Sequence, residues 1–422
     1  MTQSLKAVAG TGGSVIVTRC QVCGSRKLQP SLFVGYLPPV NQMRPIGQQP
    51  HEQPAYPAGL LHCPRCQLVQ LGLIVDSRIL FPPDYPYTSG TTRVLHENFQ
   101  ELQQECAELW QLKPKDLVVD IGSNDGTLLS KFQAAGHPVL GIEPTDAGKL
   151  ARERGIPTLA AYFTVKAAES ARKMRGRAKV ITAANCFAHI EKIHDVVKGA
   201  LKLLDKDGLF ITESHYLMPL LDTVQYDTIY HEHLRYYSLT SLSYLLELHD
   251  LEVVHAKEIP SHGGSIRVCA ARKGMRPIQP SVRQMLDAEA ARGPMTEQLA
   301  TFKQRTVRSK LQLHALLAGI KAAGHRVAGV GAPSRASTLV NYTGLDDGIL
   351  EYVLEVKGSR KIGRYLPGTL VPVIEESRLF EDQPEYALLF SWHIAAELMP
   401  KLRQKGYQGK FILPLPEPRI VE

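Results

Sequence analysis

The sequence has no uninterrupted apolar run of about 18 residues, which is the minimum that a transmembrane helix needs. Its N-terminal stretch, MTQSLKAVAGTGGSVIV, contains one lysine and no long apolar segment before a small-residue cleavage site. We therefore expect a flexible tail and no signal peptide there. Together these absences predict a cytoplasmic protein with no membrane partner.

Cysteine is scarce, with seven residues in a chain of 422. The odd number, without a secretion signal, favours a reducing compartment. Apolar residues make up 44% and charged residues 21% of the chain, a globular composition that excludes a disordered protein. A chain of this length exceeds one ordinary hydrophobic core, so we expect two or three domains.

Acidic residues are nearly absent from the N-terminal part. Residues 1–66 contain six Lys or Arg and one Glu, which places +5 of the net charge of +8 there. A basic excess suits a phosphorylated substrate or nucleic acid, or it is a solvated surface without a partner. Because the interleaved basic and aromatic residues that stack on bases are missing, we expect no nucleic-acid partner.

Four of the cysteines form two closely spaced pairs. Cys20 and Cys23 are separated by 39 residues from Cys63 and Cys66. Two such pairs supply the four thiolates of a closed tetrahedral zinc site, so we expect a structural zinc ion. Two disulfides or a redox pair are the alternatives, and a reducing compartment disfavours both.

Strand and helix patterns alternate through most of the chain. A helix over 92–111 is followed by βα units over 117–214, which predicts an α/β fold with a parallel sheet covered on both faces. Residues 283–320 are predicted to be helical, with a break at Gly293-Pro294. The expected parts are a zinc-binding domain at 14–80, an α/β domain at 81–282, a helical linker at 283–320 and a second, smaller Rossmann-like domain at 321–422.

The first strand of the α/β domain ends in a glycine-containing turn, 117-LVVDIGSNDGTLL-129. Gly122 lets the backbone approach a ligand, and Gly126 begins a helix whose N-terminus favours electronegative groups. A dinucleotide site needs a second glycine beside the pyrophosphate, and Asn124 occupies that position. Glu143 follows at the end of the next strand, where a carboxylate can accept both ribose hydroxyls.

This turn resembles the S-adenosylmethionine site of class I methyltransferases, because the amino-acid end of that cofactor needs no pyrophosphate cradle. We therefore favour S-adenosylmethionine over the dinucleotide of a dehydrogenase. The expected cofactor-binding residues lie in the turn, at two strand ends and in the exit from the zinc-binding domain. They are Asp120, Gly122, Ser123, Asn124, Gly126, Glu143, Pro144, Asn185 and Ser89.

Several segments together resemble one family and keep its order. They are the two CxxC pairs, DIGSNDGTLL, AANCFAHI, DTIYHEHLRYYSL, SHGGSIRV and GAPSRASTLVNY. The resemblance is to the nucleotide-sugar C-methyltransferases, which build branched deoxysugars in antibiotic and cell-surface pathways. It implies a class I methyltransferase domain and a C-terminal domain that helps to hold the nucleotide. The implied substrate is a 4-keto sugar on a nucleoside diphosphate.

The run 227-DTIYHEHLRYYSL-239 carries side chains that this chemistry needs. Removing a proton beside a ketone requires a base of near-neutral pKa and a donor for the enolate oxygen. By resemblance we assign His233 as the base, Glu232 as its orienter or an alternative base, and Tyr230 as the donor. The alternatives are a structural turn, or a metal site formed by His231 and His233 on one face of a strand.

Other residues are expected around this run. His189, at a strand end, is expected to face the substrate, because ligands collect at the carboxyl ends of such strands. Resemblance places at least one of Tyr85 and Tyr87 in the site. The expected substrate-binding residues are Asn41, His262, Gly263, Ser334, Arg335 and Lys361. Arg335 follows a glycine-rich turn, where it could grip a diphosphate with two nitrogens. For each segment, a turn without a ligand is the alternative.

One segment departs from the family pattern. Residues 351–373, EYVLEVKGSRKIGRYLPGTLVPV, lack the Asp-containing run that usually follows the strand, although the PGxxxP ending is kept. The sugar, the nucleoside and the accepting atom therefore stay open. An O- or N-methyltransferase and an RNA methyltransferase that uses the basic N-terminal part are the alternatives. We expect a monomer that acts on a nucleotide sugar.

Overall fold

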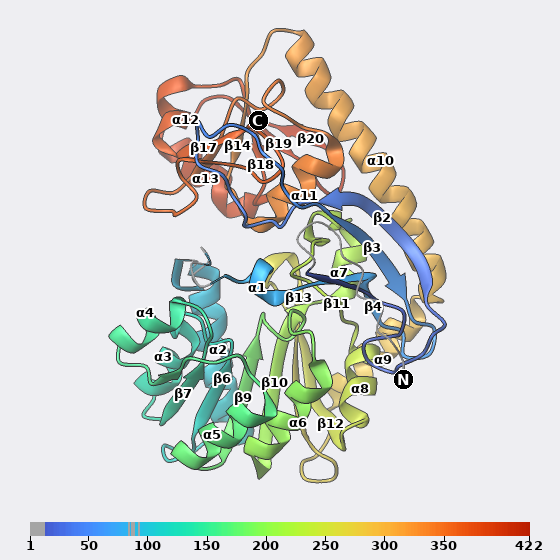
Figure 1. Ribbon diagram of the computed structural model, residues 1–422, viewed down its shortest axis with the longest axis vertical. Helices are drawn as coiled ribbons and strands as arrows, with labels where there is room; N and C mark the ends of the chain where they lie inside the picture. The colour runs from blue at the N-terminus through green and yellow to red at the C-terminus, as the bar shows by residue number, and fades with distance from the viewer. Residues whose placement is uncertain (1–12, 83–84, 86–88, 92) are drawn as a thin grey trace.

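The computed structural model describes residues 13–82, 85, 89–91 and 93–422. Two α/β lobes lie one above the other, and a small β-sheet and the long helix α10 run along one side of them (Figure 1). Tyr87 lies outside the described residues, so its predicted role is not addressed by the structure. Within the described ranges, no helix is long and apolar enough to span a bilayer.

The N-terminal part is built from short antiparallel strands. Its strands are β1 (Ser14–Ile16), β2 (Gln29–Leu37), β3 (Tyr56–His62), β4 (Val69–Leu71) and β5 (Leu73–Val75), followed by α1 (Ser77–Leu80) and η1 (Ser89–Thr91). Strand β1 pairs with β5, and a second sheet has the order β11-β4-β3-β2. Strand β11 (Arg235–Tyr236) directly follows the YHEH run, so that run is held by the sheet of the N-terminal part.

The central domain contains a seven-stranded sheet of order β12-β13-β10-β9-β6-β7-β8. The strands are β6 (Val118–Ile121), β7 (Val139–Ile142), β8 (Thr158–Leu159), β9 (Ala178–Ala184), β10 (Leu204–His215), β12 (Leu251–Ile259) and β13 (Ser265–Arg272). The strands within the predicted range 117–214 pair in parallel, which confirms the expectation, while β13, further along the chain, is antiparallel to both of its neighbours. Only the short turn η3 (Ser261–Gly263) joins β12 to β13, and so short a connection can link only antiparallel strands.

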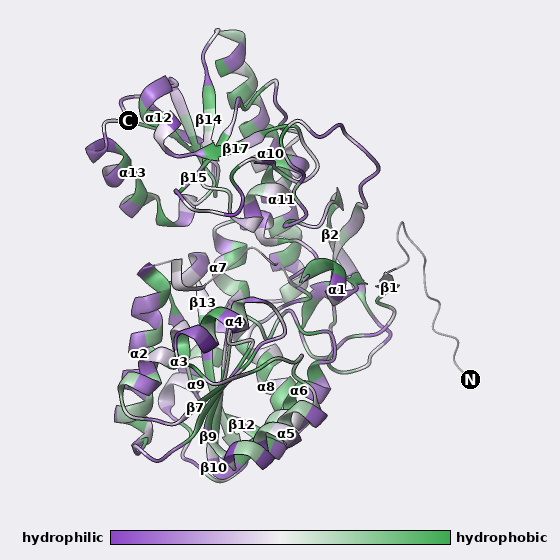
Figure 2. Cartoon of the chain, turned by 60° about the vertical axis from the view of Figure 1, so that its left-hand side comes forward, coloured by the Kyte–Doolittle hydropathy of each residue, from purple (hydrophilic) through white to green (hydrophobic). Residues whose placement is uncertain are grey.

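Helices cover the central sheet. They are α2 (Arg93–Trp110), α3 (Thr127–Ala134), α4 (Ala147–Glu153), α5 (Val165–Arg175), α6 (Ile193–Leu203), α7 (Leu217–Asp222) and α8 (Leu239–Glu247), with η2 (Tyr226–Thr228) before the YHEH run. Val118 and Val119 of β6 are fully buried in two different core clusters. Because neighbouring strand residues point to opposite faces, this confirms that both faces are covered. Figure 2 shows the apolar strands inside and hydrophilic helix faces outside.

Two helices connect the central domain to the C-terminal domain. Helix α9 spans Pro280–Ala291 and α10 spans Met295–Ala322. The break between them lies at the predicted position, since Gly293 has a left-handed φ of 80° and Pro294 precedes the first turn of α10. A left-handed residue followed by proline cannot continue a helix, so this sequence signal was sufficient.

The C-terminal domain is a second seven-stranded sheet, of order β16-β17-β15-β14-β18-β19-β20. Its elements are β14 (Val327–Val330), α11 (Ser334–Thr343), β15 (Val353–Glu355), β16 (Arg364–Tyr365), β17 (Pro372–Glu375), α12 (Ser377–Asp382), β18 (Tyr386–Leu389), η4 (Trp392–Ile394), α13 (Ala395–Gln404), β19 (Lys410–Leu413) and β20 (Arg419–Val421). Strands β15 to β17 lie on one side of β14 and β18 to β20 on the other, as in a Rossmann-like sheet, so the glycine-rich turn after β14 begins at the switch point.

The C-terminal domain contacts both other parts. Thr338 of α11 donates to the Ile229 carbonyl at 3.3 Å, directly before the YHEH run. The long segment between β2 and β3 reaches the same domain, where the Tyr365 amide donates to the Arg44 carbonyl at 2.8 Å. The YHEH run therefore lies where all three parts of the chain meet.

Candidate active site and metal centre

The four paired cysteines come together. The sulfur atoms of Cys20 and Cys66 are 3.5 Å apart and those of Cys23 and Cys63 are 3.4 Å apart. All four lie within 4.8 Å of one another. A disulfide would bring two sulfur atoms to about 2.05 Å, so the disulfide alternative does not hold. Four convergent thiols are a complete donor set for tetrahedral zinc and leave no position for a substrate.

Both cysteine pairs adopt the same local turn. Gly24 and Gln67, each directly after its pair, have left-handed φ values of 69° and 59°. Their amides donate to the carbonyls of Cys20 and Cys63 at 3.0 and 2.8 Å. This turn directs both thiols of a pair to the same side, which is why the CxxC spacing predicted the site from sequence.

The glycines of the GSNDG turn are needed for packing as well as for ligand approach. Gly122 has a φ of 67°, and a Cβ there would lie 2.9 Å from the Cβ of Cys186. Gly126 begins α3 with a φ of 78°, and its Cβ would lie 3.0 Å from Ile156. The Asp120 side chain beneath the turn is buried and accepts from Thr182 at 2.6 Å. Burial raises the pKa of Asp120 to about 8.

The predicted cofactor residues gather around this turn. Glu143 accepts from the Asn124 amide at 3.0 Å and from Thr145, while the Ser89 amide donates to the Asn124 side chain at 3.0 Å. Two buried polar atoms here, Ser123 Oγ and Asn185 Oδ1, have no hydrogen-bond partner among the described residues. Unpartnered polar atoms at strand ends fit a ligand with donor and acceptor groups. Pro144 follows Glu143 at the same strand end.

His233 lies in a fixed orientation. Its Nδ1 is 2.8 Å from the Thr228 carbonyl, so Nδ1–H donates and Nε2 keeps its lone pair. The rings of His189, His215 and Tyr230 lie 5.0, 4.9 and 4.1 Å from its ring. Burial, followed by the His189 charge, holds the pKa of His233 well below its ordinary value. The ring is therefore neutral and can accept a proton at Nε2.

The histidines around His233 share its environment. Burial lowers the pKa of His189 and of His262 to about 4, and that of His215 well below its ordinary value. His262 has a left-handed φ of 57°, and its ring stacks on His215 at 5.6 Å. Its Nε2 is buried without a partner within the described part of the chain. Together these rings form a neutral, polar wall beside His233.

Glu232 faces a different group of residues. It accepts from Asn41 and from the Tyr85 hydroxyl, each at 2.8 Å, and Asn41 Nδ2 also lies 3.2 Å from Ser334 Oγ. Burial raises the pKa of Glu232 to about 7, and these two donors oppose the rise. The contacts of Glu232 do not include His233, whose ring the Thr228 carbonyl orients, so the role of orienter is corrected.

The two histidines of the YHEH run diverge. His231 Nε2 donates to the Pro57 carbonyl at 3.3 Å, and its ring packs on Tyr56, away from His233. The run is a turn, so the alternation of a strand that would bring both rings to one face does not apply. Among the described residues, the four cysteines are the one group that could hold a metal, and the alternative metal site at this run is wrong.

Two of the predicted substrate residues contact Glu232 or its neighbours, and the others contact different parts of the protein. Asn41 and Ser334 contact the Glu232 cluster, whereas Lys361 is turned inward and donates to the Ala332 carbonyl at 2.6 Å. Arg335 is only 6% exposed and has protein partners. The Gly263 carbonyl accepts from Gln225 at 2.6 Å. These contacts position the turns around the site.

Three residues near the YHEH run were missed by sequence reasoning. His215 ends β10, and its place at the carboxyl end of a strand was a usable signal. Asp227 and Trp392 are joined by a 2.8 Å hydrogen bond across 165 residues. No local pattern could have paired them.

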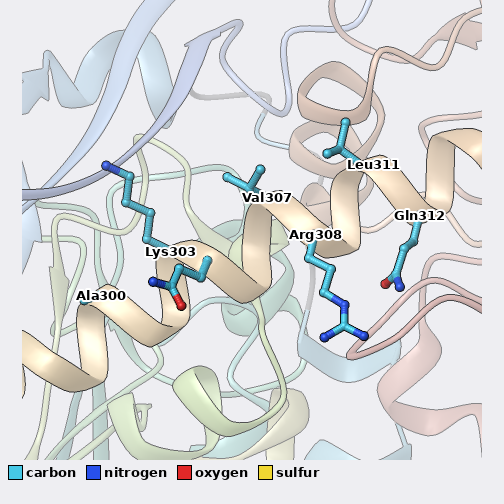
Figure 3. Close-up of a pocket in the computed structure, with 7 residues that line it drawn as sticks. Ala300, Lys303, Val307, Arg308, Leu311 and Gln312 are labelled. Carbon is cyan, nitrogen blue, oxygen red and sulfur yellow. The ribbon is translucent and has the colours of Figure 1, made fainter.

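A large open groove lies elsewhere, along α10 (Figure 3). It has a volume of about 790 Å³, and its lining comes from residues 300–312 of that one helix. Among the described residues this lining is the face of a single helix, and its titratable side chains are Lys303 and Arg308, which do not provide the acid–base or nucleophilic groups of an active site.

Three family models match consecutive parts of the chain. They are a zinc binding domain at residues 20–81, a methyltransferase domain at 94–256 and a C-methyltransferase C-terminal domain at 260–416. The C-methyltransferase NovU of Streptomyces niveus is 34% identical over 409 residues, which covers 96% of this chain and 97% of NovU.

Two solved methyltransferase structures each resemble less than half of the chain. Magnesium protoporphyrin IX methyltransferase from Synechocystis, solved with bound S-adenosylmethionine, is 13% identical, with a TM-score of 0.33, 43% of this chain covered and 80% of that one. An S-adenosylmethionine-dependent methyltransferase from Anabaena variabilis is 16% identical, with a TM-score of 0.33 and coverages of 42% and 86%.

Proposed function

Since the chain belongs to the C-methyltransferase family that includes NovU, we propose that it transfers a methyl group from S-adenosylmethionine to a carbon of a nucleotide-diphosphate 4-keto sugar. The observation that supports this most is the buried His233, whose Nδ1 is held by the Thr228 carbonyl at 2.8 Å. Carbon methylation requires removal of a C–H proton, and the Nε2 lone pair of a neutral imidazole can accept it; burial holds the pKa of His233 below the near-neutral range, in which Glu232, at about 7, lies.

The residues of the GSNDG turn would hold the cofactor. Gly122 and Gly126 allow close approach, and Ser123 and Asn185 offer unpartnered atoms. Glu143 accepts two hydrogen bonds at Oε1 and one at Oε2, so Oε2 has a lone pair left for a ribose hydroxyl. When bound, S-adenosylmethionine supplies an electrophilic methyl group. The zinc ion would have a structural role, since four thiolates fill its coordination shell.

The loop residues would then act on the sugar. His233 takes the proton from the carbon beside the ketone, and the electron pair of that C–H bond forms the enolate. Burial holds the pKa of Tyr230 well above its ordinary value, so its hydroxyl keeps its proton and can donate to the enolate oxygen. Glu232, whose pKa is raised to about 7, is the alternative base.

The substrate class is supported by the family resemblance and by the basic N-terminal part. A ketone is needed because it lowers the cost of the carbanion, and a diphosphate suits the basic excess of residues 1–66. None of the seven cysteines forms a disulfide, which supports a reducing, cytoplasmic location. We propose that the product is a branched deoxysugar nucleotide.

Incubation with S-adenosylmethionine and a panel of 4-keto nucleotide sugars tests the proposal. We expect a product heavier by one methylene group, with the new methyl on carbon by nuclear magnetic resonance. In deuterated water without cofactor, the substrate should exchange the proton beside the ketone. Methylation of an oxygen or nitrogen, or no product with any keto sugar, would overturn the proposal.

A further inference from the structure

Arg335 makes its contacts inside the protein. From α11 its Nη2 donates to the His262 carbonyl at 2.9 Å, and its Nη1 lies 3.2 Å from His393 Nδ1 and 3.7 Å from Asp227 Oδ2. Its guanidinium also lies 5.7 Å from the centre of the Trp392 ring. A guanidinium with these partners and 6% exposure is poorly placed to grip a diphosphate in solvent.

Asp227 is the acidic partner of Arg335 and is fully buried. Its Oδ2 accepts from Trp392 Nε1 at 2.8 Å, while Oδ1 has no hydrogen-bond partner in the described part of the chain. A buried carboxylate is costly unless a cation compensates it, and removing one member of such a pair leaves the other charge unpaired. The charge of Asp227 therefore depends on a residue of the C-terminal domain.

We propose that Arg335 and Asp227 form a buried link through which the C-terminal domain positions the reaction loop, residues 229–233, so that Arg335 is a positioning residue for proton removal. The catalytic consequence of this inference rests on the proposed function, whereas the link itself does not. The C-terminal domain thus contributes to the geometry of the base, in addition to any contact with the nucleotide.

One connection from the link to His233 runs through the backbone of residues 227 and 228. Asp227 lies in η2, and the next residue, Thr228, provides the carbonyl that accepts from His233 Nδ1 at 2.8 Å. A shift of Asp227 would therefore move the group that fixes the orientation and tautomer of the His233 ring. Thr338 of α11 holds the Ile229 carbonyl on the other side of Thr228.

The link also reaches His233 through the histidine wall. Arg335 holds the carbonyl of His262, whose ring stacks on His215 at 5.6 Å, and His215 packs on His233 at 4.9 Å. The Arg335 charge contributes, after burial, to the lowered pKa of His233, His215 and His262. A fixed cation at this place keeps these rings unprotonated, so that their nitrogen lone pairs are available.

Steady-state kinetics of Arg335→Gln, Asp227→Asn and the double variant test the role in catalysis. We expect each single variant to lower kcat about 10- to 100-fold, with KM for the nucleotide sugar changed less than about threefold, because a misplaced base slows chemistry. The double variant should be no worse than the worse single one. Arg335→Lys, which keeps the charge, should recover part of the lost kcat.

Hydrogen exchange measured by mass spectrometry tests the link without any substrate. Peptides covering residues 226–235 should exchange about tenfold faster in Arg335→Gln and in the milder Trp392→Phe, which removes one donor to Asp227. The control is Arg326→Gln, which removes a half-exposed guanidinium paired with Glu351 in the same domain. It should leave kcat and this exchange unchanged.

Two outcomes would overturn the inference. Unchanged exchange at 226–235 in both Arg335→Gln and Trp392→Phe would show that the pair does not hold the loop. A raised KM and weakened binding of thymidine or uridine diphosphate, with kcat unchanged, would show that Arg335 is a diphosphate ligand. If instead the wild-type protein methylates no keto sugar, the proposed function fails while the exchange experiment still decides about the link.

Discussion

His233 and Glu232 are adjacent in the chain, yet their surroundings push their protonation in different directions. Around His233, burial and neighbouring imidazoles favour the neutral ring. Around Glu232, burial raises the pKa to about 7 despite the donors Asn41 and Tyr85. Two groups that are separated in this way are the usual mark of an acid–base site. Because the surroundings of His233 and Glu232 differ, single substitutions can show which of the two residues removes the proton.

Replacing His233 with alanine should abolish methylation, with a loss of at least about 100-fold in kcat, because the Nε2 lone pair is removed. Binding of S-adenosylmethionine should be unchanged in titration calorimetry, since His233 is outside the GSNDG turn. Glu232→Gln serves as the comparison. If His233→Ala keeps turnover while Glu232→Gln loses it, Glu232 is the base.

Replacing Glu232 with glutamine should stabilise the protein at pH 8 but not at pH 4. The folded protein keeps the Glu232 proton up to about pH 7, whereas the unfolded chain releases it near pH 4.5, so the free energy of unfolding falls as pH rises through this window. Glutamine does not ionise, so the variant avoids this fall in the free energy of unfolding, which is about 1–3 kcal/mol.

Urea unfolding at both pH values measures this difference. Glu247→Gln, an exposed carboxylate on α8, is the control and should differ little from wild type at either pH. If Glu232→Gln changed the free energy of unfolding equally at pH 4 and pH 8, the protonation of Glu232 would not contribute to the pH dependence of stability.

At the scale of elements, short turns decide the position of both expected cofactors. The two cysteine turns share one backbone conformation, with Gly24 and Gln67 left-handed. The turn between β6 and α3 also needs left-handed residues, and Gly122 in addition lacks room for a Cβ beside Cys186. Because such requirements are local, they are visible in the sequence as glycine and cysteine spacing.

Gly122→Ala should weaken S-adenosylmethionine binding at least about tenfold and lower the free energy of unfolding by about 2–4 kcal/mol, because the new Cβ meets Cys186 at 2.9 Å in a left-handed backbone. Gly136→Ala is a matched control, with a φ of 88° and nothing within 4 Å of a Cβ. It should cost about 1 kcal/mol and leave the Kd for the cofactor unchanged. Equal effects of the two variants would exclude a special role for the turn.

Cys63→Ser should reduce the bound zinc from one ion per chain to well below one, measured by elemental analysis of the purified protein. Loss of one thiolate opens the tetrahedral site, and the folding energy supplied by the metal is lost with it, so the Tm should fall. Cys106→Ala, which removes a buried thiol of α2 in a different core cluster from Cys63, should keep one zinc per chain. Full zinc content in Cys63→Ser would rule out the four-cysteine site.

At the scale of the whole molecule, three parts of the chain meet at Glu232. Asn41 comes from the segment after β2, Tyr85 from the exit of the N-terminal part, and Ser334 from the start of α11. Strand β11, directly after the YHEH run, completes the N-terminal sheet. The central domain alone therefore does not contain the complete site.

Asn41→Ala should lower the free energy of unfolding by about 1–3 kcal/mol and reduce kcat/KM, because it removes hydrogen bonds that join three parts of the chain at a buried carboxyl. Gln42→Ala is the adjacent control, since its side chain donates to the Ile79 carbonyl, which lies within the N-terminal part. Chemical denaturation and steady-state kinetics measure both effects. Equal results for the two variants would contradict a joining role for Asn41.

Much of the fold was predictable because its signals are local. Three predictions depend on residues that are close together in the sequence, and the structure confirms them. They are the βα alternation, the helix break at Gly293-Pro294 and the convergence of the paired cysteines. The antiparallel β13 was not predicted, since the strand alternation that preceded it pointed to a parallel sheet. The roles of the individual site residues stay predictions.

The sequence was sufficient to predict the family, the four cysteines that converge and the turn that we propose for the cofactor, because these depend on spacing within about 20 residues or on paired motifs. The side chains that surround His233 and Glu232 are brought together only by the folding of the whole chain. Thr228 orients His233, Asn41 and Tyr85 hold Glu232, and Arg335 turns inward to Asp227. Such partners lie up to 191 residues apart, and burial, which sets their protonation, exists only once the chain has packed.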